Sequence, residues 1–161
     1  MQSIPLRAFM GAIVAIAILA AASVSALAQT FATETLTVRT SGGASHVFTV
    51  ELATTSNQRA LGLMNRDMMA ADHGMLFDFG ESRFVYMWMK NTHLPLDMLF
   101  VRQDGTIVRV AADTEPLSEA IVDSGELVYF VLELNAGTAK RLGISVGDRL
   151  DSPTIAARAS P

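Results

Sequence analysis

The chain contains no cysteine among its 161 residues. Disulfide bonds, thiol chemistry and attachment through a lipidated amino-terminal cysteine are therefore all excluded. Small exported domains often rely on disulfides because they meet oxidising conditions. A domain without them must gain its stability from packing.

Basic clusters and metal-ligand patterns are scarce too. No extended cluster of lysine and arginine follows residue 28, and the formal net charge of −4 becomes −5 once Arg7 is removed with the first 28 residues. Nucleic acids and anionic membranes attract basic patches, so neither is expected as a main partner. His46, His73 and His93 share no ligand spacing such as H-x-x-x-H, so we expect no metal site and no cofactor.

The amino terminus has the pattern of a secretory signal peptide. Arg7 supplies the positive charge, residues 8–22 form an uncharged and mostly apolar run, and Ala26-Leu27-Ala28 is an A-x-A cleavage site. Cleavage after Ala28 predicts a periplasmic or secreted protein. The alternative is a retained membrane anchor, because the apolar run extended to Ala28 approaches the roughly 20 residues that span a bilayer.

The remaining chain has the length of one domain. We expect a signal peptide over 1–28, a linker over 29–34, a single globular domain over 35–150 and a flexible tail over 151–161. Strand patterns occur at 35–39, 47–52, 75–79, 84–89, 98–101, 106–111, 126–134 and 146–150. The run at 84–89 is apolar on both faces, which is typical of a central or doubly covered strand.

Two short helices are expected. Thr55 and Gln58 form a capping box before a helix at 56–64, and Gly143 in the left-handed conformation ends a helix at 136–142. Strands and helices do not alternate regularly. The pattern therefore predicts a mainly β (α+β) fold, either a compact antiparallel β-sandwich or a partly closed barrel.

The segment from Trp88 to Asp97 is the strongest candidate for a binding site. Lys90 offers a charge to an anionic ligand, Asn91 and Thr92 offer hydrogen bonds, and Trp88 offers an aromatic wall. The candidate ligand-binding residues are Arg66, Trp88, Lys90, Asn91, Thr92 and Asp97. In the structural alternative, a proline fixes a turn here and Lys90 pairs with Asp97.

Glu133 lies inside the apolar run 127–134. An unpaired carboxylate there would cost several kcal/mol if buried, so Glu133 is either exposed or paired, with Arg59, Arg66 or Lys90 as candidate partners. An enzyme, most simply a hydrolase or isomerase, would use Asp97 or Glu133 as its acid/base. That function requires a carboxylate with a raised pKa in a cleft.

The methionines provide a third hypothesis. Seven of them follow residue 28, and their thioethers could bind Cu(I) together with His73 or His93. Adaptable core packing is the alternative, because Met87 and Met89 alternate along an apolar run. An exposed apolar patch around Met68, Met69 and Phe79 would instead indicate partner docking.

The chain resembles the domain of unknown function 192 family over roughly residues 35–150. The matching residues are Arg59, Gly62-Leu63-Met64, Arg66, Gly74-Met75-Leu76-Phe77, Trp88-Met89-Lys90-Asn91-Thr92, Pro95-Leu96-Asp97, Phe100, Gly105, Val131-Leu132-Glu133-Leu134, Gly137, Gly143 and Gly147-Asp148. The resemblance implies a small, often exported protein with a compact, mainly β fold and no agreed reaction. Met87 stands where the family commonly has an aromatic residue, and Gln58 where it commonly has an acid.

Together these features predict an exported domain that binds a small polar or anionic envelope ligand at the Trp88–Asp97 loop. Carboxylate-based catalysis and copper binding are the alternatives.

Overall fold

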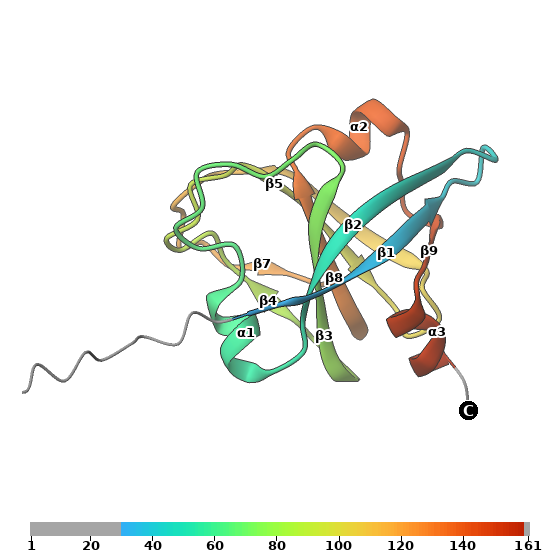
Figure 1. Ribbon diagram of the computed structural model, residues 1–161, viewed down its shortest axis with the longest axis horizontal. Helices are drawn as coiled ribbons and strands as arrows, with labels where there is room; N and C mark the ends of the chain where they lie inside the picture. The colour runs from blue at the N-terminus through green and yellow to red at the C-terminus, as the bar shows by residue number, and fades with distance from the viewer. Residues whose placement is uncertain (1–29, 160–161) are drawn as a thin grey trace, which may run out of the picture.

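The computed structural model describes residues 30–159. The predicted signal peptide lies outside the described residues. Within them, no helix is long and apolar enough to cross a membrane. The elements are β1 (Ala32–Arg39), β2 (Ser45–Ala53), α1 (Ser56–Leu61), β3 (His73–Arg83), β4 (Tyr86–Met87), β5 (Leu96–Val101), β6 (Ile107–Thr114), β7 (Val122–Asp123), β8 (Val128–Asn135), α2 (Thr138–Leu142), β9 (Arg149–Asp151) and α3 (Pro153–Ala159) (Figure 1).

Seven strands form one curled sheet in the order β6-β5-β8-β3-β2-β1-β9. Neighbouring strands are antiparallel except β2 and β3, which are parallel. The two edges meet at one end, where Thr106 forms a bridge with Arg149 and the Ile107 amide donates to the Asp148 carbonyl at 2.9 Å. The predicted mainly β fold is confirmed, and its form is a partly closed barrel.

The central strands are covered on both faces. Every residue from Val128 to Leu134 in β8 is buried, and so is all of β5. Phe130, Leu132 and Leu134 pack into one apolar cluster, whereas Val131 packs into another on the opposite face. Because side chains alternate along a strand, Glu133 points towards the second cluster, the one that α1 and β4 flank.

Both predicted helices form where their capping residues indicate. The Thr55 side chain accepts a hydrogen bond from the Gln58 amide, and the Gln58 side chain accepts from the Thr55 amide, so the capping box is complete. α1 ends earlier than expected, because the chain turns at Gly62 with a φ of 49°. α2 ends at Gly143 with a φ of 68°, as predicted.

The expectation of a central strand at 84–89 is wrong. Only Tyr86 and Met87 pair, as β4, with β7 in a separate two-stranded sheet. Val85 and Met89 are buried, whereas Phe84, Tyr86 and Trp88 are exposed. The segment therefore alternates like a half-covered strand. An apolar residue on the outer face looks the same in sequence as one in the core.

The expectation of a linker up to residue 34 and a flexible tail from residue 151 is also wrong for the described residues. β1 begins at Ala32, and α3 packs against the barrel through buried Ile155. The Thr154 hydroxyl donates to Glu34 at 2.8 Å, and the Arg158 guanidinium contacts Asp78 at 3.1 Å. The sequence of α3 shows no apolar stripe that would predict its packing, because Ile155 is its one buried residue.

Candidate functional site

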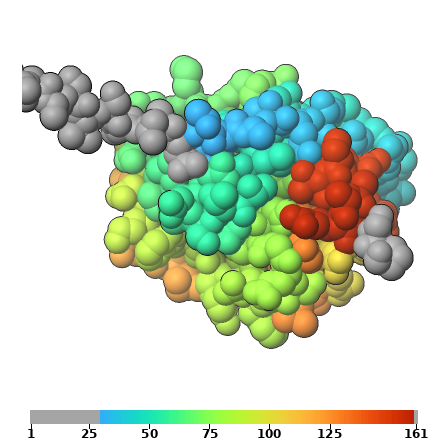
Figure 2. All heavy atoms as spheres, turned by 60° about the horizontal axis from the view of Figure 1, so that its bottom comes forward, coloured from blue at the N-terminus to red at the C-terminus, as the bar shows by residue number. Residues whose placement is uncertain are grey.

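A groove of about 280 Å³ opens beside α1 and β4 on the face of the sheet to which Glu133 points. We call it the Glu133 groove. Its lining residues are Arg59, Ala60, Leu61, Gly62, Leu63, Met64, Phe77, Phe79, Tyr86, Met87, Trp88, Thr92 and Glu133. In Figure 2 the teal atoms of α1 and the yellow-green atoms at the end of β3 lie on one face of the molecule, beside the red atoms of α3.

Three parts of the chain build the groove. The connection from β2 to β3 contributes α1 and Met64, β4 contributes Tyr86, and the sheet contributes Phe77 and Glu133. Gly62 lies at the junction with a positive φ, and a Cβ there would approach the Phe77 ring to 3.2 Å. Glycine at this position therefore allows the turn after α1 and keeps the wall close to the sheet.

Glu133 has an unusual environment. It is 4% exposed, and its neighbours across the strands are Met75 of β3 and Met98 of β5. Within residues 30–159 no hydrogen bond or ion pair reaches its side chain. Desolvation by burial raises the pKa of Glu133 to about 8. Glu133 is therefore mainly a neutral carboxylic acid at pH 7.

The predicted cation partners of Glu133 are engaged elsewhere. Arg59 donates to the Thr54 carbonyl at 2.6 Å and to the Asp78 carbonyl at 2.8 Å, and its guanidinium lies 5.5 Å from the centre of the Phe79 ring. The expectation that Glu133 is either exposed or paired is wrong, because it is buried without a partner among the described residues. Its raised pKa agrees with the requirement stated for the enzyme alternative.

Two of the six predicted ligand residues, Trp88 and Thr92, line the groove. Trp88 is 44% exposed, whereas Thr92 is buried and donates its hydroxyl to the Lys90 carbonyl at 3.2 Å. Sequence reasoning missed Tyr86, Phe77, Phe79, Met64 and Met87. The period-two alternation of 84–89 contains the signal that would have placed Tyr86 beside Trp88.

The structure does not bring the other four residues into the groove. Arg66 forms a paired hydrogen bond with Glu51, including an Nη2–Oε2 distance of 2.8 Å. Lys90 lies 3.5 Å from Glu119 and 5.2 Å from the centre of the Trp88 ring. Asn91 is exposed with a φ of 53°. Lys90 therefore pairs with Glu119. The structural alternative, in which Lys90 pairs with Asp97, is wrong.

Asp97 has a structural role. It is fully buried, and its carboxylate accepts hydrogen bonds from the backbone amides of Asp113 at 2.9 Å, Gly137 at 3.1 Å and Ala139 at 2.8 Å. Asp97 thus joins β5 to β6 and caps the first turn of α2 from a distant part of the chain. This arrangement leaves no free carboxylate oxygen aimed at the groove, which argues against Asp97 as an acid/base.

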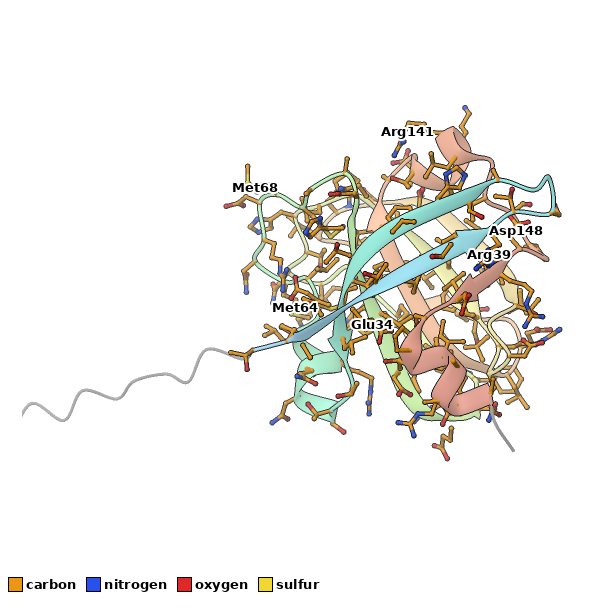
Figure 3. The ribbon with its side chains drawn as sticks, turned by 45° about the vertical axis from the view of Figure 1, so that its right-hand side comes forward. Glu34, Arg39, Met64, Met68, Arg141 and Asp148 are labelled. Carbon is orange, nitrogen blue, oxygen red and sulfur yellow. The ribbon has the colours of Figure 1, made fainter. Side chains whose placement is uncertain are left out.

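The histidines and methionines do not converge on one centre. His73 contacts Asp72 at 2.8 Å, and His93 contacts Asp67 at 3.0 Å. Among residues 30–159 there is no group of three or more His, Cys, Asp or Glu side chains suited to a metal ion. Met75, Met89 and Met98 are buried in the core, whereas Met68 is 83% exposed and points away from the barrel (Figure 3). Core packing therefore accounts for the three buried methionines.

Comparison with known proteins places the chain in a family. The model of domain of unknown function 192 (DUF192), described as "Uncharacterized ACR", matches residues 37–152. The chain belongs to the DUF192 family. No curated protein matches it.

Two crystal structures share the DUF192 fold of this chain. One is a protein of Sinorhizobium meliloti 1021 described as a candidate transcription regulator, with 58% identity, a TM-score of 0.77, and coverage of 78% of this chain and 97% of that one. The other is a protein of unknown function from Novosphingobium aromaticivorans DSM 12444. It has 38% identity and a TM-score of 0.71, and the match covers 74% of this chain and 84% of that one.

The residues that carried the DUF192 resemblance fall into two groups in the structure. Gly74 allows close approach of β3 to β8, and Asp148 accepts hydrogen bonds from the Ser41 and Ser145 amides at 2.7 Å. These residues serve the fold, as Asp97 does. Arg59, Gly62, Leu63, Met64, Phe77, Trp88, Thr92 and Glu133 line the groove. Gln58, which departs from the family pattern, still completes the capping box of α1.

Proposed function

We propose that this DUF192 protein binds a small ligand in the Glu133 groove. One observation carries the proposal: the carboxyl group of Glu133, a residue that is only 4% exposed, has no protein partner within the described residues and lies on the wall of an open groove with four aromatic side chains in its lining. Folded proteins seldom leave buried polar groups unpaired. A ligand with a hydrogen-bonding group and an apolar body would supply the missing partner and cover the aromatic rings.

The proposed site lies deeper than the Trp88–Asp97 loop expected from the sequence. Trp88 and Thr92 remain part of it, but Arg66 and Lys90 already contact Glu51 and Glu119. Arg59 is the only cation in the groove lining, and its guanidinium already donates to the Thr54 and Asp78 carbonyls, so a polar ligand that approaches Glu133 is favoured over an anion. Given the signal-peptide pattern, we propose that the protein meets this ligand in the periplasm or outside the cell.

Catalysis by Glu133 is a second candidate function. A carboxyl group whose burial raises its pKa to about 8, located in a groove, meets the requirement for a general acid. The groove lining contains no second carboxylate, no histidine and no serine. The Thr92 hydroxyl is turned to the Lys90 carbonyl. We favour binding, because no residue of the lining is positioned as a nucleophile or second acid/base beside Glu133.

The name of the Sinorhizobium relative raises DNA binding as another possibility for this chain. Seven arginines, from Arg39 to Arg158, and Lys90 lie within 4.0 Å of a carboxylate within residues 30–159. DNA binding depends on cations that are free to neutralise phosphates. We therefore do not propose a nucleic-acid partner.

Native mass spectrometry of the exported protein and NMR of the isotope-labelled protein test the proposed function. A bound organic mass, or amide shifts confined to α1, β4 and the middle of β8 when a fragment library is added, is the expected result. Trp88→Ala should abolish both signals. Phe84→Ala is the matched control, because Phe84 is an exposed aromatic of the same segment that does not line the groove.

A protein that carries no bound mass and whose groove amides respond to no compound of any class would contradict the proposal. The same mass spectrum would show whether residues 1–28 have been removed.

A further inference from the structure

The Glu133 groove combines an acidic group with aromatic rings. Phe77, Phe79, Tyr86 and Trp88 line it, and Glu133 is the only acidic residue among the lining residues. Aromatic rings present a negative face, which attracts cations most strongly where water is excluded. A carboxylate and several aromatic faces are the usual elements of a site for an organic ammonium ion.

The positive groups near the groove do not fill this site. The Arg59 guanidinium is held at the edge by the Thr54 and Asp78 carbonyls and stacks on Phe79. The Lys90 ammonium is held by Glu119 above Trp88. Each of these cations lies over one ring of the lining, so cation–π contacts already form at Phe79 and Trp88. Within residues 30–159 no cation lies over Phe77 or Tyr86.

We infer that the ligand of the Glu133 groove is a small organic cation, an amine or ammonium compound, whose charged group lies between the Glu133 carboxylate and the faces of the lining aromatic residues. This inference rests on the proposed function and specifies the chemical class of its ligand. The ligand body would lie against Met64, Met87 and the rings.

Cation binding at this position is coupled to the loss of a proton from Glu133. The neighbours of Glu133 on the adjacent strands are Met75 of β3 and Met98 of β5. The other ionisable residues in the groove lining are Arg59 and Tyr86. None of them holds Glu133 in its charged form, and burial raises its pKa to about 8. An organic cation would stabilise the carboxylate, so Glu133 would lose its proton to solvent when the cation binds.

Choline and its neutral counterpart dimethylbutanol, in which carbon replaces the nitrogen, are the probes. Choline has no titratable group, so the pH dependence of its binding reports on the protein alone. Isothermal titration in two buffers of different ionisation enthalpy should show release of most of one proton per choline at pH 7. Its association constant should rise about tenfold from pH 6 to pH 7, and less than twofold from pH 8 to pH 9.

Two variants assign the effect to Glu133. Glu133→Gln keeps the size of the neutral acid and should remove the pH dependence, with at least a tenfold loss of choline affinity at pH 9. Asp151→Asn removes an exposed carboxylate on β9, outside the groove, and should leave choline affinity within twofold of the unchanged protein. Amide shifts from NMR on both variants show that the fold is retained.

Equal or tighter binding of dimethylbutanol would overturn the cation inference, and so would choline binding that Glu133→Gln leaves unchanged. If neither probe binds but other compounds shift the groove amides, the inference fails and the proposed function stands. If no compound of any class reaches the groove, both fail.

Discussion

At the scale of single residues, Glu133 should make the stability of the protein fall with rising pH. Its pKa is about 8 in the folded protein and about 4.5 when exposed, so the folded state holds one more proton between these values. The stabilising effect is fully present below pH 4.5 and is lost as the pH rises through 8. The free energy of unfolding should fall by about 1.4 kcal/mol per pH unit across this range.

Urea denaturation between pH 4 and pH 9 measures this slope. Glu133→Gln should remove it, so the difference between the two proteins isolates the Glu133 contribution from that of other titrating groups. Parallel curves for the unchanged protein and the variant would show that Glu133 is not a buried neutral acid.

Asp97 gives a second prediction at this scale. The Asp97 carboxylate accepts hydrogen bonds from three backbone amides. In Asp97→Asn one of its two oxygens becomes an amide nitrogen, which cannot accept, so at least one of these buried amides loses its acceptor. The free energy of unfolding should fall by about 2 kcal/mol or more. Ligand binding in the Glu133 groove should not change. Asp67→Asn, at an exposed pair with His93, should change stability by less than about 0.5 kcal/mol.

If a folded Asp97→Asn protein lost ligand binding in the groove, Asp97 would be part of the binding site.

The role of Asp97 was hidden from sequence reasoning, because its partners at Gly137 and Ala139 lie some 40 residues further along the chain. The unusual position of Glu133 was visible as a carboxylate inside an apolar run, but its protonation state depends on burial that only the fold defines.

At the scale of elements, the pair β3 and β8 depends on a glycine. A Cβ at Gly74 would lie 2.7 Å from the Glu133 carbonyl oxygen, which is closer than real contacts allow. Gly74→Ala should therefore force the strands apart and lower the free energy of unfolding by about 2 kcal/mol or more. Gly42→Ala is the control, because its Cβ would meet nothing closer than 3.8 Å. Chemical denaturation of both variants measures the difference, and equal stability would contradict the close packing of the strands.

Elements with local signals were predicted well. The capping box of Thr55 and Gln58 and the left-handed Gly143 depend on neighbours within five residues, and both are present. The pairing of β4 with β7 in a separate sheet and the helix α3 were not predicted, because both depend on which face the barrel covers. An apolar run shows what can be buried, whereas the topology decides what is buried.

At the scale of the whole molecule, the barrel and the groove should differ in local stability. β3, β5 and β8 each have a strand on both sides, whereas β4 and β7 form a separate ribbon of two residues each. Amide hydrogen exchange should therefore be slowest in β8 and at least about a hundredfold faster at the β4–β7 ribbon, since opening the ribbon does not require unfolding of the sheet. A bound ligand should slow exchange at β4 and leave β8 unchanged. Uniform protection across both would show that the ribbon unfolds only with the barrel.

The parallel pairing of β2 and β3 has a consequence for how such a protein can diversify. Two parallel neighbours need a crossover connection, and here it runs from Thr54 to Asp72 and includes α1 with one wall of the groove. Its two ends are fixed by the sheet, but its interior is not part of the barrel. An exchange of this crossover between two related chains should therefore transplant ligand preference without disturbing the scaffold, as loop grafting does in antibodies.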